Sequence, residues 1–250
     1  MTAPSLDPVS AGPWDTFVAY SGLHLVMVCV CGLAVAGLAA AGRALRDTHE
    51  AAFRRVLGIF GIVYWVSYNI WWNRNGVDLV GGLPLQICDL NGLIAPLALL
   101  TLNRWLRGTL YFWTFALTIQ AFIQPSLTFG PTFAAFWWFW AQHTIIIACA
   151  VYDLVVLGLR PDWRDLGRVY VVSAIYLAAV IPLNIRLGSN YGFIGNPPPP
   201  VRIPPFIDAL GPWPARALIV VALAAAAFAL VELPWQISKL RKSAGRHDEK

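Results

Sequence analysis

Apolar residues occupy long, almost uninterrupted runs along the chain, and short polar segments separate these runs. A helix needs about 20 mostly apolar residues to cross the hydrocarbon core of a bilayer, with about 17 as the lower limit. Seven runs meet this requirement. They predict membrane-spanning helices at Phe17–Ala41, Phe53–Trp72, Leu83–Leu102, Gly108–Gln124, Phe133–Leu159, Leu166–Leu187 and Trp213–Ile237. Asp89 and Asn91 interrupt the third run, so a re-entrant segment is the alternative there.

The composition supports a membrane environment. The 250 residues are 58% hydrophobic and only 12% charged, whereas soluble domains are about 25% charged. We therefore expect an all-α, polytopic transmembrane helix bundle of about seven helices in the cell membrane. Residues 1–16 are predicted to form a segment outside the membrane, residues 17–237 the seven-helix domain, and residues 238–250 a basic cytoplasmic tail.

Basic residues cluster in alternate connections between the predicted helices. Short cytoplasmic loops are enriched in Lys and Arg, so this alternation predicts the topology. With seven helices and a basic C-terminal tail, the N-terminus lies outside and the C-terminus in the cytoplasm. The residues assigned to the cytoplasmic side are Arg43, Arg46, Arg54, Arg55, Arg104, Arg107, Arg160, Arg164, Arg168, Lys239, Arg241, Lys242, Arg246 and Lys250.

Polar residues within the predicted spans gather in the outer half of the bilayer. Because polar groups are costly in hydrocarbon, each one needs a partner or a purpose. The inner halves are largely Ala, Val, Leu and Ile, apart from Asp153 and Glu232 near the cytoplasmic ends. We therefore predict a polar cavity that opens toward the outer leaflet. The outer polar residues are His24, Tyr68, Asn69, Asn73, Cys88, Asp89, Asn91, Gln120, Gln124, Ser126, His143 and Asn184.

Cys88 and His143 are the candidate catalytic pair, because a thiol nucleophile needs a base to take its proton. A helix that begins at Leu83–Pro84 places Cys88 about one turn inside its N-terminus, where the helix dipole favours negative charge. Two structural interpretations stay open beside this one. A membrane cysteine often fills space as a small apolar residue, and an intramembrane histidine often hydrogen-bonds a neighbouring helix.

Other polar residues complete the predicted site. Asn91, one turn beyond Cys88 on the same face, and Gln124 are candidate donors to an oxyanion. Asp89 is a positioning group, an ion-pair partner or a protonated carboxyl. No metal-ligand spacing, nucleotide-binding glycine loop or nucleic-acid patch is evident. The predicted substrate-binding residues are Gln86, Asp89, Asn91, Asn69, Gln120, Gln124, Asn190 and Tyr191.

Three stretches carry a family resemblance. They are LPLQICDLNGLIAPLALL at Leu83–Leu100, FWAQHT around His143, and SNYGF at Ser189–Phe193. With these stretches the chain resembles the YwaF-like integral membrane proteins, a family related to a eukaryotic transmembrane phospholipid acyltransferase. The resemblance extends over most of the chain, roughly Phe53–Ile237.

The resemblance implies a multi-helix membrane enzyme in which the motif cysteine accepts an acyl chain and the histidine is its partner. Cys88 and His143 stand at these positions. Gln86 stands where many members have a histidine, so the resemblance implies no second imidazole at this position.

The expected function is therefore transfer of a fatty acyl chain between phospholipid and lysolipid through a Cys thioester with a His base. Membrane phospholipid and lysophospholipid are the predicted partners. No soluble cofactor is expected, because coenzyme A thioesters are not available outside. The alternative is a non-catalytic transporter or binding protein for a small solute or lipid headgroup. An activated Cys88 would react more readily with an electrophile than Cys29, Cys31 or Cys149, which separates the two hypotheses.

Overall fold

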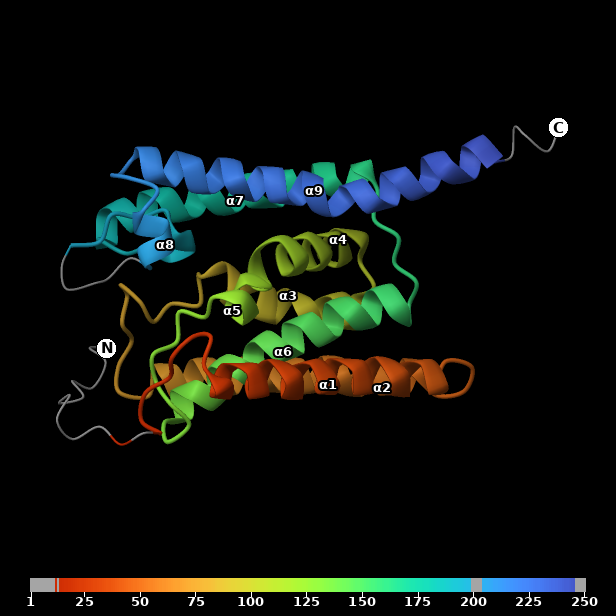
Figure 1. Cartoon of the computed structure of the whole chain (residues 1–250), viewed down its shortest axis with the longest axis horizontal. Helices are drawn as coiled ribbons and strands as arrows, with labels where there is room; N and C mark the ends of the chain where they lie inside the picture. Colours follow the sequence, from red (N-terminus) through yellow and green to blue (C-terminus); the bar gives the residue numbers. More distant parts are fainter. Residues whose placement is uncertain (1–11, 13, 199–203, 246–250) are drawn as a thin grey trace.

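Helices that run back and forth along one direction make up the fold (Figure 1). The structure, a computed structural model, describes residues 12, 14–198 and 204–245. It confirms the predicted all-α class. The elements are α1 (Gly22–Ala44), α2 (Glu50–Trp72), α3 (Ile87–Thr101), α4 (Arg104–Phe112), the π-helix η1 (Trp113–Thr118), α5 (Gln120–Ile123), α6 (Ala134–Val155), α7 (Trp163–Leu187), the 3₁₀ turn η2 (Tyr191–Phe193), α8 (Pro205–Asp208) and α9 (Ala215–Gly245).

Among the described residues, four helices are long and apolar enough to cross a membrane: α1, α6, α7 and residues 215–239 of α9. The chain is therefore a multi-pass membrane protein. The other three predicted runs also overlap helices, but each differs from a simple span. α2 is equally long and less apolar, α3 has only 15 residues, and the fourth run is divided among α4, η1 and α5. The seven-span topology stays a prediction.

The third run begins its helix later than the sequence predicted. We expected a start at Leu83–Pro84, but α3 begins at Ile87, with Gln86 extended before it (φ −65°, ψ 148°). At 1.5 Å per residue the 15 residues of α3 rise about 22 Å, less than the roughly 30 Å of a hydrocarbon core. Cys88 is consequently the second residue of the helix. The cause is a set of long-range hydrogen bonds to the preceding segment, described with the site below.

The predicted cytoplasmic connections lie together at one end of the bundle. The α1–α2, α3–α4 and α6–α7 connections and the end of α9 are all at the right in Figure 1. Ion pairs tie two of them together: Arg104 Nε donates to Asp165 Oδ1 (2.9 Å), and Arg107 Nη2 to Asp153 Oδ1 (2.7 Å). This grouping is what the alternation of basic loops requires. The side of the membrane that this end faces stays a prediction.

Arg107→Leu is expected to destabilise the fold by about 3–5 kcal/mol, because it leaves the buried carboxylate of Asp153 without its cation. Asp153 is only 1% exposed. Thermal unfolding of the purified protein in detergent measures the loss. The double variant Arg107→Leu/Asp153→Leu should recover most of it, since the unpaired charge is then gone. A double variant as unstable as the single one would contradict this account.

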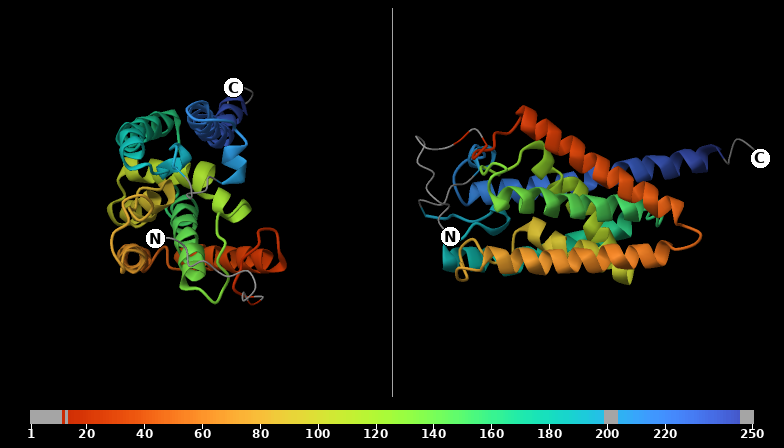
Figure 2. Two further views of the ribbon diagram at one scale, coloured as in Figure 1. Left: turned by 90° about the vertical axis from the view of Figure 1, so that its left-hand side faces the viewer. Right: turned by 90° about the horizontal axis from the view of Figure 1, so that it is seen from below.

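The packing of α2, α3 and α6 brings the predicted outer-half residues to the opposite end. α6 packs against both α1 and α3, and α2 packs along α3 (Figure 2). α2 and α3 approach closely at Gly58, where a Cβ would lie 2.5 Å from Leu100 Cγ. Small residues allow such close approach between membrane helices. On the far side of α4 and η1 lie α7 and α9.

A short segment before α1 is joined to the loop before α6. Thr16 and Phe129 form an isolated antiparallel bridge, and the Thr132 hydroxyl donates to Asp15 Oδ1 (2.7 Å). The pKa of the Asp15 carboxyl lies below its usual value, because the Thr132 hydroxyl and the Gly12 N–H both donate hydrogen bonds to it. These contacts fix the 126–132 loop, part of which lines the site.

Portions of two predicted segments, together with residues 199–203 between α7 and α8, lie outside the described residues. The two portions are residues 1–11 and 13 of the N-terminal segment and residues 246–250 of the basic tail.

Candidate functional site

The loop between α7 and α8 holds the segment that precedes α3. Gln86 Oε1 accepts a hydrogen bond from the Gly192 N–H (2.9 Å), and Gln86 Nε2 donates to the Asn190 carbonyl oxygen (3.2 Å). Gly192 has φ 69°, the left-handed region that glycine enters without a steric penalty. Gln86 therefore links two segments that are far apart in the sequence, and α3 begins immediately after it.

Tyr191 adds further hydrogen bonds between the same two segments. Its hydroxyl accepts from the Leu83 N–H (3.2 Å) and donates to the Leu79 carbonyl oxygen (2.9 Å). The Asn184 side chain in turn accepts from the Tyr191 N–H (2.9 Å) and donates to the Tyr191 carbonyl oxygen (2.9 Å). Tyr191 is fully buried. The predicted substrate-binding residues Tyr191 and Asn190 thus act by positioning the start of α3.

Cys88 is partly exposed at the second position of α3, and η1 lies beside it. Thr118 of η1 lies near the thiol. Asn91 donates through Nδ2 to the hydroxyls of Thr114 and Thr118, at 3.1 Å each. A threonine hydroxyl that accepts from Asn91 still has its own proton to donate. The Asn91 amide, predicted to contact an oxyanion, is used here to hold η1.

His143 is buried on α6 with one defined free nitrogen. Its Nδ1 lies 2.7 Å from the Phe139 carbonyl oxygen. A carbonyl oxygen only accepts hydrogen bonds, so in the neutral ring Nδ1 carries the proton and Nε2 keeps a free lone pair. The Phe139 ring packs against the imidazole at an interplanar angle of 38°, with 4.3 Å between ring centroids. His143 is thus held in the tautomer in which Nε2 is a base.

His24 has a different arrangement. Its Nδ1 accepts from the Tyr20 N–H (2.9 Å) and its Nε2 contacts the Phe122 carbonyl oxygen (2.9 Å). Both nitrogens are engaged, so His24 fastens the start of α1 to α5 and is no candidate base.

Gln142 connects α6 to the start of α3. Its Nε2 donates to Asp89 Oδ1 (3.0 Å) and contacts the Cys88 carbonyl oxygen (3.4 Å). The Asp89 carbonyl oxygen also accepts from Trp65 Nε1 (2.7 Å). Within the described part of the chain Asp89 forms no ion pair, which leaves a positioning group or a protonated carboxyl. The neighbour of His143 therefore contacts both Cys88 and Asp89.

A cavity of about 620 Å³, partly open to the surroundings, lies among α2, α3, α6 and the 126–132 loop. We call it the histidine cavity. Asp89 and His143 both line it, whereas Cys88 does not. Because Asp89 directly follows Cys88 and lines the cavity, Cys88 stands close beside this cavity. Its lining is Tyr68, Trp72, Asp89, Ser126, Leu127, Thr128, Phe129, Ala135, Phe139, Gln142 and His143.

Of the eight predicted substrate-binding residues only Asp89 lines this cavity; the other seven do not: Gln86, Asn69, Asn91, Gln120, Gln124, Asn190 and Tyr191. Asn69 donates to the Trp65 carbonyl oxygen of its own helix (2.8 Å). Gln120 and Gln124 are exposed, since the helix of the fourth run ends at α5. The polar groups of the outer half are therefore only partly brought together.

Gln142, Tyr68 and Thr118 are site residues that the sequence prediction did not include. Gln142 directly precedes His143, and Tyr68 already belonged to the outer polar set. Thr118 had no comparable signal, because its position depends on the π-helix η1. Such π-helical turns are frequent at functional sites. In the part of the chain that the structure describes, no three His, Cys, Asp or Glu side chains are grouped as metal ligands would be.

The helices and their buried polar groups together define a multi-pass helical membrane protein. Comparison of the sequence with known families gives a more particular assignment. The TMEM164 family matches residues 19–232, and the chain belongs to this family. Neither a curated protein nor a solved structure matches the chain.

Proposed function

We propose that the chain is an integral membrane lipid acyltransferase that moves a fatty acyl chain from a phospholipid to a lysolipid. In this proposal Cys88 carries the chain as a thioester and His143 is the base. The TMEM164 family is related to eukaryotic transmembrane acyltransferases, which supports a reaction of this class. The narrower affiliation with YwaF-like proteins belongs to the same proposal.

One observation carries the proposal: the hydrogen bond from His143 Nδ1 to the Phe139 carbonyl oxygen. It leaves Nε2 as a base in a cavity that Asp89 also lines, and Asp89 directly follows Cys88. Gln142, next to His143, reaches the Cys88 carbonyl oxygen. The reaction requires the Cys88 sulfur and His143 Nε2 to come within hydrogen-bond distance when lipid is bound.

In the first half-reaction His143 Nε2 takes the proton of the Cys88 thiol. The thiolate attacks the carbonyl carbon of a phospholipid ester, and the carbon–oxygen bond of the ester breaks. The leaving oxygen takes the proton from His143, which releases a lysophospholipid. The acyl chain is now bonded to Cys88, and no oxidant, reductant or soluble carrier is consumed.

In the second half-reaction a lysolipid hydroxyl gives its proton to His143 Nε2. The hydroxyl oxygen attacks the thioester carbonyl carbon, the carbon–sulfur bond breaks, and the sulfur recovers the proton. A new phospholipid leaves with the acyl chain. The free enzyme is restored, so membrane lipids are both donor and acceptor.

The oxyanion formed in each step needs hydrogen-bond donors. Asn91 is already engaged with two threonines, and Gln124 does not line the histidine cavity. The first N–H groups of a helix have no intrahelical acceptor. Because Cys88 is the second residue of α3, backbone N–H groups at the start of this helix are the donors that we propose for the oxyanion.

A binding or transport role is the second candidate, and the histidine cavity itself favours it. An unpaired buried acceptor, Gln142 Oε1, faces no protein donor among the described residues and could hold a polar ligand. The two functions differ at Cys88. A transporter needs no thioester, whereas the proposed enzyme forms one in every turnover.

The test uses purified protein in lipid nanodiscs with a phospholipid labelled in its acyl chain, and an added lysolipid. We expect label in newly formed phospholipid and, at short times, on the Cys88 peptide. Hydroxylamine should release the label from the protein, because it cleaves thioesters. Exposed Cys29 is the internal control and should stay unlabelled. Transfer without label on Cys88 would reject the thioester, and no transfer under any lipid composition would reject the proposed function.

A further inference from the structure

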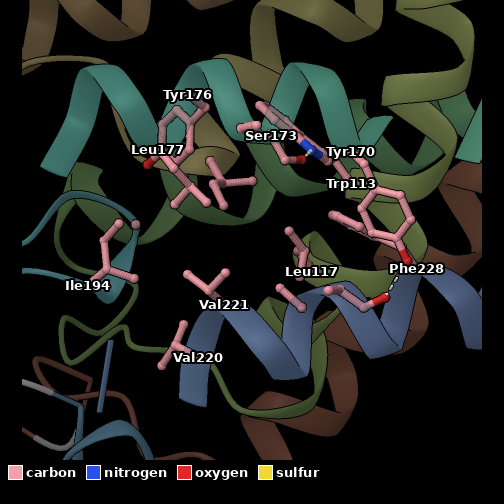
Figure 3. A pocket seen from close by; sticks show the side chains of 15 residues that line it. Trp113, Leu117, Tyr170, Ser173, Tyr176, Leu177, Ile194, Val220, Val221 and Phe228 are labelled. Atoms are coloured by element: carbon pink, nitrogen blue, oxygen red, sulfur yellow. Dashed lines mark hydrogen bonds between the residues drawn. The ribbon is translucent and has the colours of Figure 1, made fainter. Parts of the chain in front are cut away.

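A second cavity, which we call the apolar cavity, lies between α7 and α9 and reaches η1 (Figure 3). Its empty volume is about 620 Å³ when the space open to the surroundings is included. Side chains of both helices point into it, among them Leu177 of α7 and Val221 of α9 (Figure 3). The proposed reaction gives this cavity no role so far.

The lining offers almost no free polar group. It contains three hydroxyls, and each has a partner in the protein. Tyr170 donates to the Ala225 carbonyl oxygen (2.9 Å), Ser173 accepts from Trp113 Nε1 (3.0 Å), and Tyr176 donates to the Leu85 carbonyl oxygen (2.9 Å). The remaining side chains that line it are hydrocarbon or aromatic. An occupant of this cavity is therefore apolar where the protein surrounds it.

The inner end of the apolar cavity reaches the candidate nucleophile. Ile87, which directly precedes Cys88, lines the cavity. Leu117 also lines it, and the next residue, Thr118, accepts a hydrogen bond from Asn91 of α3. Tyr176 of the same lining donates to the Leu85 carbonyl oxygen, in the segment that leads into α3.

Cys88 thus stands between two cavities of different chemistry. Ile87, directly before it, lines the apolar cavity, and Asp89, directly after it, lines the histidine cavity. A phospholipid ester has the same two-part character, with a polar headgroup on one side of the carbonyl and a hydrocarbon chain on the other. The histidine cavity matches the headgroup side of the ester, and the apolar cavity matches the hydrocarbon chain.

The apolar cavity also has a route from the bilayer. It lies between two helices that are apolar enough to span a membrane. Ala174 of α7 belongs to the lining and is exposed, so the cavity opens where a lipid-facing helix surface begins. An acyl chain can enter sideways without crossing water.

We propose that the apolar cavity holds the hydrocarbon part of the acyl chain that Cys88 carries. This inference rests on the proposed function and adds a specificity site to it. A chain that arrives from the bilayer already lies in hydrocarbon, so burial gives no large gain from leaving water. Selection comes from packing, because a close-packed wall admits only the chain length that its volume accommodates.

The test compares variants in acyl transfer with donors of short, medium and long saturated chains. Val221→Phe reduces the space between α7 and α9, and we expect the optimum to move to shorter chains. The rate of transfer of the longest chain should fall about tenfold or more relative to that of the shortest. One added methylene can have an effect of this size in a tight apolar pocket. Leu177→Ala enlarges the cavity and should move the optimum the other way, which damage to the fold would not do.

Ala222→Phe is the matched control, because Ala222 is exposed on the same helix and does not line the cavity. It should keep the wild-type preference. An unchanged chain preference in Val221→Phe and Leu177→Ala, with label still forming on Cys88, would overturn the inference and leave the proposed function intact.

A second measurement does not depend on turnover. A phospholipid with a photoactivatable diazirine near the end of one acyl chain should crosslink to peptides of α7 and α9 that line the cavity. Val221→Phe should reduce this crosslink, whereas Ala222→Phe should not. Crosslinks confined to lipid-facing surfaces and insensitive to Val221→Phe would also overturn the inference. Crosslinking inside the cavity without any transfer would keep the acyl-chain site and reject the proposed reaction.

Discussion

Cys88→Ala is expected to abolish acyl transfer and the labelled protein intermediate together. The sulfur is the atom to which the acyl chain becomes bonded, and a methyl group cannot replace it. Removal of a nucleophile that acts as one unit with its base lowers the catalytic rate by about 10⁴-fold or more. The measurement is the initial rate of labelled phospholipid formation in nanodiscs, with detection of hydroxylamine-sensitive label on the protein.

Two further cysteine variants make this result specific. Cys29→Ala removes an exposed thiol of the same chain and should transfer at the wild-type rate. Cys88→Ser keeps a hydrogen-bonding group beside Thr118 but supplies a weaker nucleophile, so it should fold normally and transfer slowly. A Cys88→Ala protein with wild-type transfer would eliminate the thioester mechanism.

His143→Gln is expected to lower the rate of acyl transfer by about 10²–10⁴-fold, the usual contribution of a positioned acid–base group. Glutamine can still donate a hydrogen bond but cannot take the thiol proton. Hydroxide replaces the base as the pH rises, because the thiolate fraction then increases without help. The deficit relative to wild type should therefore shrink at high pH, which a purely structural defect would not produce.

The measurement is the rate of label arrival on Cys88 in a single turnover, over a range of pH. His49→Gln is the matched control, because His49 is exposed at the other end of the bundle and should have no effect. His24→Gln should lower stability instead, since both ring nitrogens of His24 are engaged in hydrogen bonds. A His143→Gln deficit that is equal at every pH would argue that His143 only supports the structure.

The pattern of apolar runs was sufficient to predict the positions of the main helices, because length and hydropathy are local properties of the chain. The start of α3 was predicted wrongly, because it depends on Gln86 and its bonds to Asn190 and Gly192. These residues are more than a hundred positions apart, and a single sequence does not show that they meet. Cys88 is therefore nearer to its helix start than predicted.

The candidate site was predictable to a similar extent. Asp89 and His143 do line one cavity, as their common depth in the bilayer suggested. Gln120 and Gln124 have the same depth, but the interrupted helix of the fourth run leaves them exposed. The apolar cavity had no sequence signal, because residues such as Val221 that line a cavity have the same composition as residues that face lipid. Depth alone does not give the direction in which a side chain points.

Two independent features of the structure restrict which residue can replace Gly192, whose N–H donates to Gln86 before α3. Its φ of 69° is unfavourable for other residues, and a Cβ there would lie 2.7 Å from the Tyr176 hydroxyl oxygen. Replacement of Gly192 by another residue would therefore disturb the loop, the Tyr176 side chain and the position of Cys88 at once. We expect position 192 to stay glycine among members of the family even where the neighbouring residues vary. An alignment of homologous sequences would reveal an exception directly.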